Sequence, residues 1–182
     1  MFRRADEQLL KAMVRQAIAE RSAAATIERA NARADAVVER ATLRQQALDT
    51  ALRKMLDPLY EDPKHRAYLE SIRVAEEYLR NNEEPNAFMF WLRYACAQAQ
   101  RAQNEPLPED REDGKRKAIE ASKKVLRYSR DAGRYWLSVL SNPNHPDKMP
   151  GEDDLQVLFG DAAFENLVGK EPYRMRGSAS AE

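Results

Sequence analysis

Between Arg3 and Asp57 the sequence contains neither proline nor glycine, and Pro58 is the first residue that would break a helix. One helix over this window would have about 50 residues and, at 1.5 Å per residue, a length of roughly 80 Å. That is several times the length of an ordinary globular helix. Such lengths are typical of coiled coils and of helices that cross a large assembly, so the sequence predicts a helical fold with one very long element.

A regular apolar pattern runs along this window. Positions spaced alternately by three and four residues carry apolar side chains, with Glu20, Asn31 and Gln45 as the polar exceptions. A heptad pattern kept over this distance predicts left-handed packing against a partner helix, within the chain or in another chain. We call this line of positions the seam. It comprises Glu20, Gln45 and the candidate partner-binding residues Leu10, Met13, Ala17, Ala24, Ile27, Asn31, Ala34, Val38, Ala41, Leu48, Leu52 and Met55.

The seam is rich in alanine in its middle, which leaves other interpretations open. Small side chains let two helices approach closely, and a buried polar residue such as Asn31 can fix the register of a coiled coil. Alanine is also the strongest helix former, so a solvated single helix would show many alanines too. A third interpretation is a segment that becomes ordered only inside an assembly.

Composition excludes some classes of protein. Lysine and arginine together number 30, as do aspartate and glutamate, so no overall charge points to nucleic acid or to an anionic membrane. The single cysteine, Cys96, excludes an internal disulfide and fits a reducing compartment. The start, MFRRADEQLL, lacks the apolar run of a secretory signal, and Arg93 interrupts the most hydrophobic stretch. We therefore expect a protein of the cytoplasm or of a viral particle, neither secreted nor spanning a membrane.

The rest of the chain predicts further helices over about 63–82, 86–103 and 111–140, and a short last helix that Asp153 or Asp154 caps and that extends to Leu167. The expected fold is all-α, a long coiled-coil-like N-terminal helix plus a compact bundle of three to four helices. The expected divisions are the long helix (1–57), the bundle (58–141), a loop with the short C-terminal helix (142–170) and a flexible tail (171–182).

The fourth predicted helix is strongly basic. Between residues 115 and 134 it carries eight lysines and arginines against Glu120 and Asp131. Five of these basic residues would lie on one helical face and could contact phosphates, which predicts a salt-dependent nucleic-acid site as the less favoured function. The alternative is a solvated face that meets an acidic segment or partner. The five residues are Arg116, Lys123, Arg127, Arg130 and Arg134.

No pattern in the sequence predicts catalysis, a metal site or a cofactor. His65 and His145 are isolated and are expected at the surface, whereas Cys96 lies in an alanine-rich helix and is expected to be buried. No glycine-rich phosphate loop occurs, and the acidic pairs show no sign of converging in a cleft. We therefore expect no enzyme, no cofactor and no small-molecule substrate. The favoured function is a structural or assembly subunit that binds protein partners, or further copies of itself, through the long helix.

Overall fold

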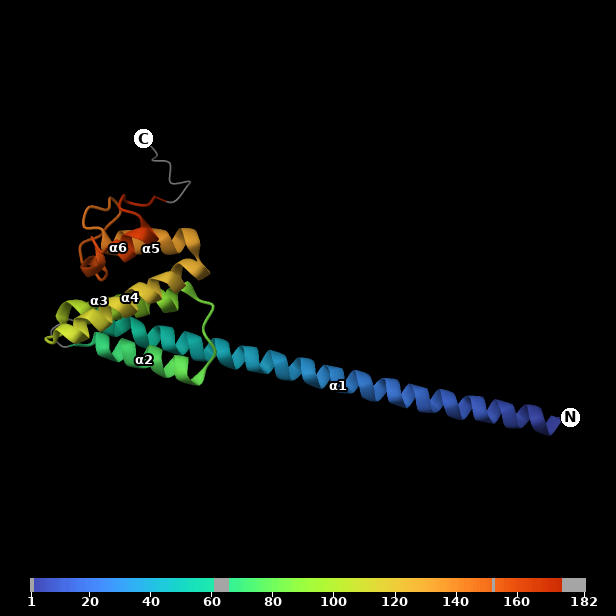
Figure 1. Ribbon diagram of the computed structural model, residues 1–182. Coiled ribbons are helices and arrows are strands. Elements are labelled where there is room, and N and C mark those ends of the chain that lie inside the picture. The colour runs from blue at the N-terminus through green and yellow to red at the C-terminus, as the bar shows by residue number, and fades with distance from the viewer. Residues whose placement is uncertain (1, 61–65, 152, 175–182) are drawn as a thin grey trace. The chain divides into compact units, whose positions relative to one another are not determined.

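In the computed structural model every regular element is helical within the described residues, 2–60, 66–151 and 153–174. Side chains are not described for residues 2–10, 12 and 60. The all-α prediction is confirmed, as is the long N-terminal helix, since α1 extends from Phe2 to Leu56 (Figure 1). The chain divides into two compact units, Met1–Gln46 and Ala47–Glu182, which we call the arm and the bundle.

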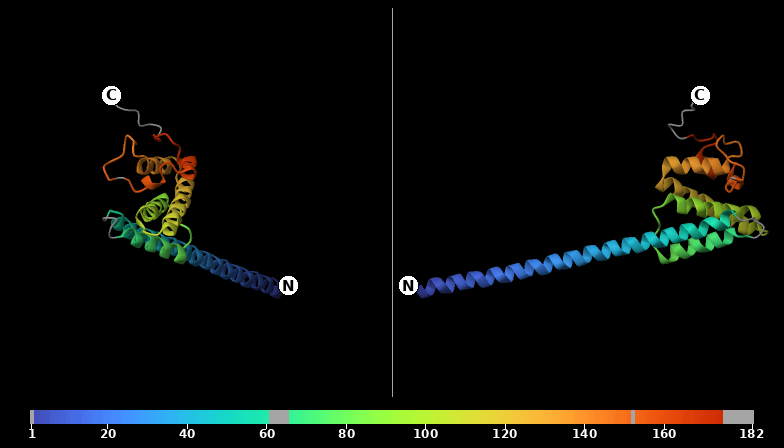
Figure 2. Two further views of the ribbon diagram at one scale, coloured as in Figure 1. Left: turned by 60° about the vertical axis from the view of Figure 1, so that its left-hand side comes forward. Right: turned by 180° about the vertical axis from the view of Figure 1, so that it is seen from behind.

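The bundle begins inside α1, earlier than the expected boundary after residue 57. It contains the end of α1, the 3-10 turn η1 (Asp57–Tyr60), α2 (Tyr68–Asn81), α3 (Phe88–Asn104), α4 (Pro108–Tyr128), α5 (Arg130–Ser141), the 3-10 turn η3 (Gln156–Leu158) and α6 (Ala162–Val168). The last turns of α1 and the helices α2, α3 and α4 pack side by side, and α5 and α6 lie on the other side of α4 (Figure 2).

Helix α3 is at the centre of the bundle. Every side chain from Tyr94 to Gln100 is buried, so neighbours cover this helix on all sides. Its closest partner is α4, and the approach depends on small residues. A Cβ atom on Gly114 of α4 would lie 2.8 Å from the carbonyl oxygen of Gln98 and 2.9 Å from the backbone nitrogen of Ala102. The alanines of α3 and Gly114 therefore allow the two backbones to pack almost in contact.

The prediction of one helix over 111–140 is wrong. Helix α4 begins at Pro108, because proline fits the first turn of a helix, where its missing N–H is not needed. It ends at Tyr128, since Ser129 has extended backbone angles (φ −155°, ψ 94°) and α5 begins at Arg130. A Cβ atom on Gly133 would lie 2.8 Å from Cγ1 of Val125, so the absence of a side chain on Gly133 lets α5 pack tightly against the end of α4.

The cap of the last helix was also predicted at the wrong residues. The carboxylate of Asp161 accepts hydrogen bonds from the backbone nitrogens of Ala163 and Phe164, at 2.9 and 3.1 Å, and so begins α6. Asp154 lies before η3 and accepts a hydrogen bond from Nε2 of Gln100 at 2.6 Å. The start of the helix predicted over about 63–82 lies outside the described residues.

Candidate partner-binding surface and charged residues

The arm carries large apolar side chains at its surface. Between residues 11 and 46, none of the described side chains is buried. Seven large apolar residues there are more than half exposed: Met13, Val14, Ile18, Ile27, Val37, Val38 and Leu43. Met13, Ile27 and Val38 belong to the seam, Val14 and Val37 flank it, and Ile18 and Leu43 lie away from it on the helix. An exposed apolar line of this length is a candidate surface for partner binding.

The smaller members of the seam lie on the same exposed face. Ala17, Ala24, Asn31, Ala34 and Ala41 are all exposed, whereas the side chain of Leu10 lies outside the described residues. A shallow depression at the centre of the arm is lined by Ala24, Ile27, Glu28, Asn31, Ala32 and Asp35. Four of these, Ala24, Ile27, Glu28 and Asn31, form the kind of surface hole that receives one side chain of a packed helix in a coiled coil.

The last three candidate seam residues belong to the bundle. Met55 is fully buried, and Leu48 and Leu52 are partly buried against the core. The backbone carbonyl of Met55 also accepts a hydrogen bond from Oγ of Ser71 at 2.8 Å, and Nη1 of Arg93 donates to the carbonyl of Leu52. The bundle of the same chain therefore already covers this end of the seam, and the exposed part extends from Met13 to Ala41.

Three of the candidate phosphate-binding residues lie on α4 beside acidic partners. Arg116 pairs with Asp113 at 2.5 Å, Lys123 with Glu120 at 2.5 Å, and Arg127 with Glu84 at 3.7 Å. Glu84 also accepts hydrogen bonds from Lys124 at 2.7 and 2.8 Å and from the Tyr128 hydroxyl at 2.5 Å. The hydrogen bonds from Lys124 and Tyr128 hold the pKa of Glu84 below its ordinary value. Carboxylates of the same chain thus offset much of this positive charge.

The other two candidates lie on α5, beyond the break at Ser129, so the five residues do not share one helix. Arg130 is exposed. Arg134 is half-buried, donates from Nε to the carbonyl of Val168 at 2.7 Å, and lies over the Tyr173 ring at 4.7 Å from its centroid. Its contacts connect α5 to the C-terminal segment. The five residues therefore lie on two helices, not on the single helical face that was expected, and phosphate binding by them stays a prediction.

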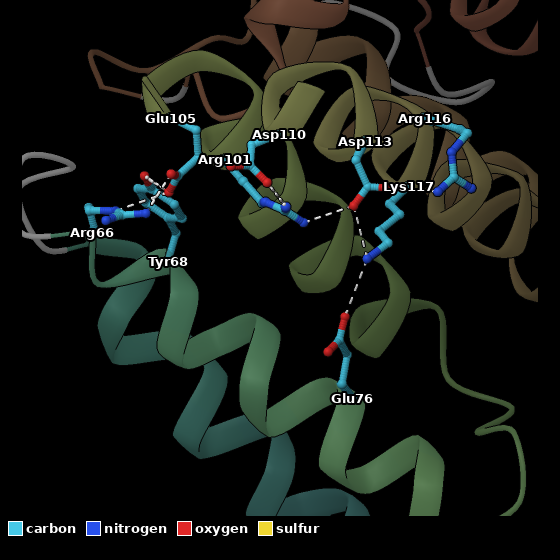
Figure 3. Close-up of polar contacts among 9 residues, drawn as sticks. All are labelled: Arg66, Tyr68, Glu76, Arg101, Glu105, Asp110, Asp113, Arg116 and Lys117. Carbon is cyan, nitrogen blue, oxygen red and sulfur yellow. Dashed lines mark hydrogen bonds and ion pairs between the residues drawn. The ribbon is translucent and has the colours of Figure 1, made fainter. Parts of the chain in front are cut away.

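One cluster of charged side chains joins α2, α3 and α4 (Figure 3). Arg101 of α3 pairs with Asp110 at 2.6 Å and with Asp113 at 3.0 Å, both on α4. Asp113 also pairs with Lys117 at 3.1 Å, and Lys117 lies 3.7 Å from Glu76 of α2. Burial acts to raise the pKa of Asp113, but hydrogen bonds from Lys117 and Arg116 outweigh it, so this pKa lies below its ordinary value.

A second charged group lies at the start of α2. The carboxylate of Glu105 is almost fully buried and accepts hydrogen bonds from Nε and Nη2 of Arg66, at 3.0 and 2.5 Å, and from the Tyr68 hydroxyl at 3.0 Å. Burial, with the adjacent carboxylate, raises the pKa of Tyr68. Every charge in this group has a partner, and the contacts join the end of α3 to the beginning of α2. In both groups the paired charges join neighbouring helices.

The expectation of a surface position is wrong for His145, and His65 lies outside the described residues. His145 is buried beside the Tyr135 ring. Its Nδ1 accepts a hydrogen bond from the backbone nitrogen of Asp147 at 3.2 Å, and Nε2 lies 3.1 Å from the carbonyl oxygen of Tyr173. With Nδ1 as an acceptor, Nε2 is the ring nitrogen placed to donate to the carbonyl oxygen of Tyr173. The second partner is 28 residues away in sequence, so no local pattern could have predicted the burial.

The prediction of a buried Cys96 is confirmed, and burial raises the pKa of its thiol well above the ordinary value. Among the described residues, no group of three histidine, cysteine or acidic side chains is placed to hold a metal ion. Within the same residues, no helix has both the length and the apolar character needed to cross a membrane.

Comparisons of this chain with protein-family models, with curated proteins and with solved structures find no match.

Proposed function

We propose that this chain is a non-enzymatic structural subunit of a larger assembly, and that it binds its partners through the arm. One observation carries this proposal, the exposed apolar seam from Met13 to Ala41. Helices in water gain most of their stability from packing an apolar face, and the arm has no buried side chain among those described between residues 11 and 46. A partner helix on the seam would supply that packing.

The bundle supports a structural role by its contrast with the arm. Its apolar side chains form one core around α3, and ion pairs such as Arg101 with Asp110 and Arg66 with Glu105 join its helices. A bundle of this kind supplies a stable body while the arm remains open to a partner. A ring or shell of repeated subunits, such as a virus particle, is one setting that suits a small helical subunit with a long arm.

The nucleic-acid alternative has less support. Arg116, Lys123 and Arg127 lie beside carboxylates, and Arg134 bonds to the backbone of its own chain. Contacts with phosphates would have to compete with these interactions, which lowers the affinity gained from each charge.

The proposal is tested by placing a charge on the seam and recovering the assembly from the natural source of the protein. Val38→Glu would bury a carboxylate against the partner, so we expect the tagged variant to lose the assembly that the native chain retains. Leu43→Glu is the matched control, because Leu43 is similarly exposed on the opposite side of the same helix.

Size-exclusion chromatography with mass spectrometry of the recovered proteins gives the result. Retention of the full assembly by Val38→Glu would rule out the seam as the partner-binding surface. Equal loss of the assembly with both variants would show that any added charge disturbs the arm. The proposal that the seam is the binding face would then fail.

A further inference from the structure

We propose that the partner on the seam is the arm of a second copy of this chain, running antiparallel, with the twofold axis between residues 24 and 27. This inference rests on the proposed function and names the occupant of the same surface. Between Met13 and Val38, four pairs of seam residues face each other in this register, and each pair occurs twice. They are Met13 with Val38, Ala17 with Ala34, Glu20 with Asn31, and Ala24 with Ile27.

These pairs are complementary in size and polarity. The two bulky end residues, Met13 and Val38, face each other, and both are more than three-fifths exposed in the single chain. The polar residues Glu20 and Asn31 face each other and can form a hydrogen bond. At the centre, Ala24 of the second copy lies over the depression formed by Ala24, Ile27, Glu28 and Asn31. Each hole thus receives a small side chain, which lets the helices approach closely.

Charges beside the seam favour the same orientation. Arg21, Glu28 and Asp35 are exposed, lie one heptad apart, and each follows a seam residue on the same flank. In an antiparallel pair this flank faces its own copy. In the proposed register Arg21 of one chain then lies between Glu28 and Asp35 of the other, and the reverse also holds. Two arginines therefore meet four carboxylates, and the close contact of Glu28 with its copy at the centre is the one repulsive pair.

A parallel pair lacks this complementarity. In register, Glu20 would face Glu20, and the residues opposite Arg21, Glu28 and Asp35 would be Gln16, Ala23 and Ala30, none of them charged. Moving the antiparallel register by one heptad sets Val38 against Glu20 in one direction and Met13 against Asn31 in the other. Among these antiparallel registers, only the proposed one pairs apolar residues with apolar ones. Its overlap of about seven helical turns is long enough for a stable coiled coil.

Cysteine cross-linking of the full chain tests both the orientation and the register. Two variants, Ala17→Cys and Ala34→Cys, are mixed and oxidised gently, and each is also oxidised alone. We expect an interchain disulfide in the mixture only, because in the antiparallel pair each residue 17 lies about 26 Å along the axis from its own copy. A mixture of Ala17→Cys with Ala41→Cys reports the register shifted by one heptad and should not cross-link. The native chain controls for Cys96, whose thiol is buried.

Charge reversal gives an independent measurement. Arg21→Glu should weaken self-association by about tenfold in sedimentation equilibrium, since the reversed charge lies between two carboxylates. Arg29→Glu makes the same change on the opposite side of the helix and should leave the association constant unchanged.

Each contrary result has a distinct meaning. Cross-linking of either single variant alone would show a parallel pair, and cross-linking of the Ala17/Ala41 mixture would show another register; both overturn the inference. Absence of any disulfide from a chain that sediments as a monomer would exclude a second copy. If Val38→Glu still loses the assembly in that case, another protein occupies the seam and only the present inference fails.

Discussion

At the scale of single residues, backbone proximity decides which positions tolerate change. Gly114 lies in the middle of α4, where glycine usually weakens a helix. Glycine fits this position because α3 packs so closely that its backbone would lie within 3 Å of a Cβ atom on residue 114. His145 shows the same dependence on distant atoms, because its ring is satisfied by the backbone at Asp147 and Tyr173.

Gly114→Ala is therefore expected to destabilise the bundle by about 2 kcal/mol, although alanine is the better helix former. The added methyl group meets backbone atoms of α3, which cannot rotate away as a flexible side chain could. Chemical denaturation measures the change in the free energy of unfolding. Glu112→Ala, at an exposed position of the same helix, should change it by less than about 0.5 kcal/mol. A Gly114→Ala variant as stable as the native chain would show that α3 and α4 are not packed this closely.

These residue positions also show what a sequence cannot reveal. The burial of Cys96 could be predicted, because alanine and aromatic neighbours surround it along its own helix. The roles of Arg134 and His145 could not, since their partners, Val168 and Tyr173, lie some thirty residues away in the chain. Arg134 is one of several basic residues between 115 and 134, and nothing in the nearby sequence indicates that its side chain contacts a distant backbone carbonyl.

At the scale of elements, α1 serves two units. Its last turns pack into the bundle through Met55, whereas the part that belongs to the arm exposes Met13. A continuous pattern of apolar residues predicted the helix correctly but did not distinguish these two environments. The long helix was predictable because a stretch free of proline and glycine needs no tertiary information. The break at Ser129 was not, because serine is no strong helix breaker and the tight packing of Gly133 on Val125 is a tertiary contact.

Methionine substitutions in the same helix separate the two environments. Met55→Ala should destabilise the bundle by about 3 kcal/mol, because it leaves a cavity in a fully buried site. Met13→Ala should not change the unfolding of the bundle, since Met13 is 61% exposed and lies in the arm. The thermal unfolding of both variants, followed at a concentration where the chain is monomeric, measures the difference. Equal effects of the two substitutions would contradict the division of α1 between the two units.

At the scale of the whole molecule, stability and partner binding are assigned to different parts of the chain. The bundle has a single core, and ion pairs such as Arg101 with Asp110 and Arg66 with Glu105 join its helices. The arm has charged residues on the flanks of the seam, which interact favourably with water. The exposed apolar side chains of the seam do not. Substitutions on the exposed part of the seam, from Met13 to Ala41, should therefore change assembly without changing the folding of the bundle.

The most direct test of this division is the native mass of the purified full chain, measured by sedimentation equilibrium over a wide range of concentration. With a second copy on the seam, the mass should rise from that of one chain, 20.9 kDa, to twice that value. Val38→Glu should remain at 20.9 kDa over the same range of concentration. A native chain that stays at the monomer mass at every concentration, and that retains no other protein when purified from its source, would contradict the account.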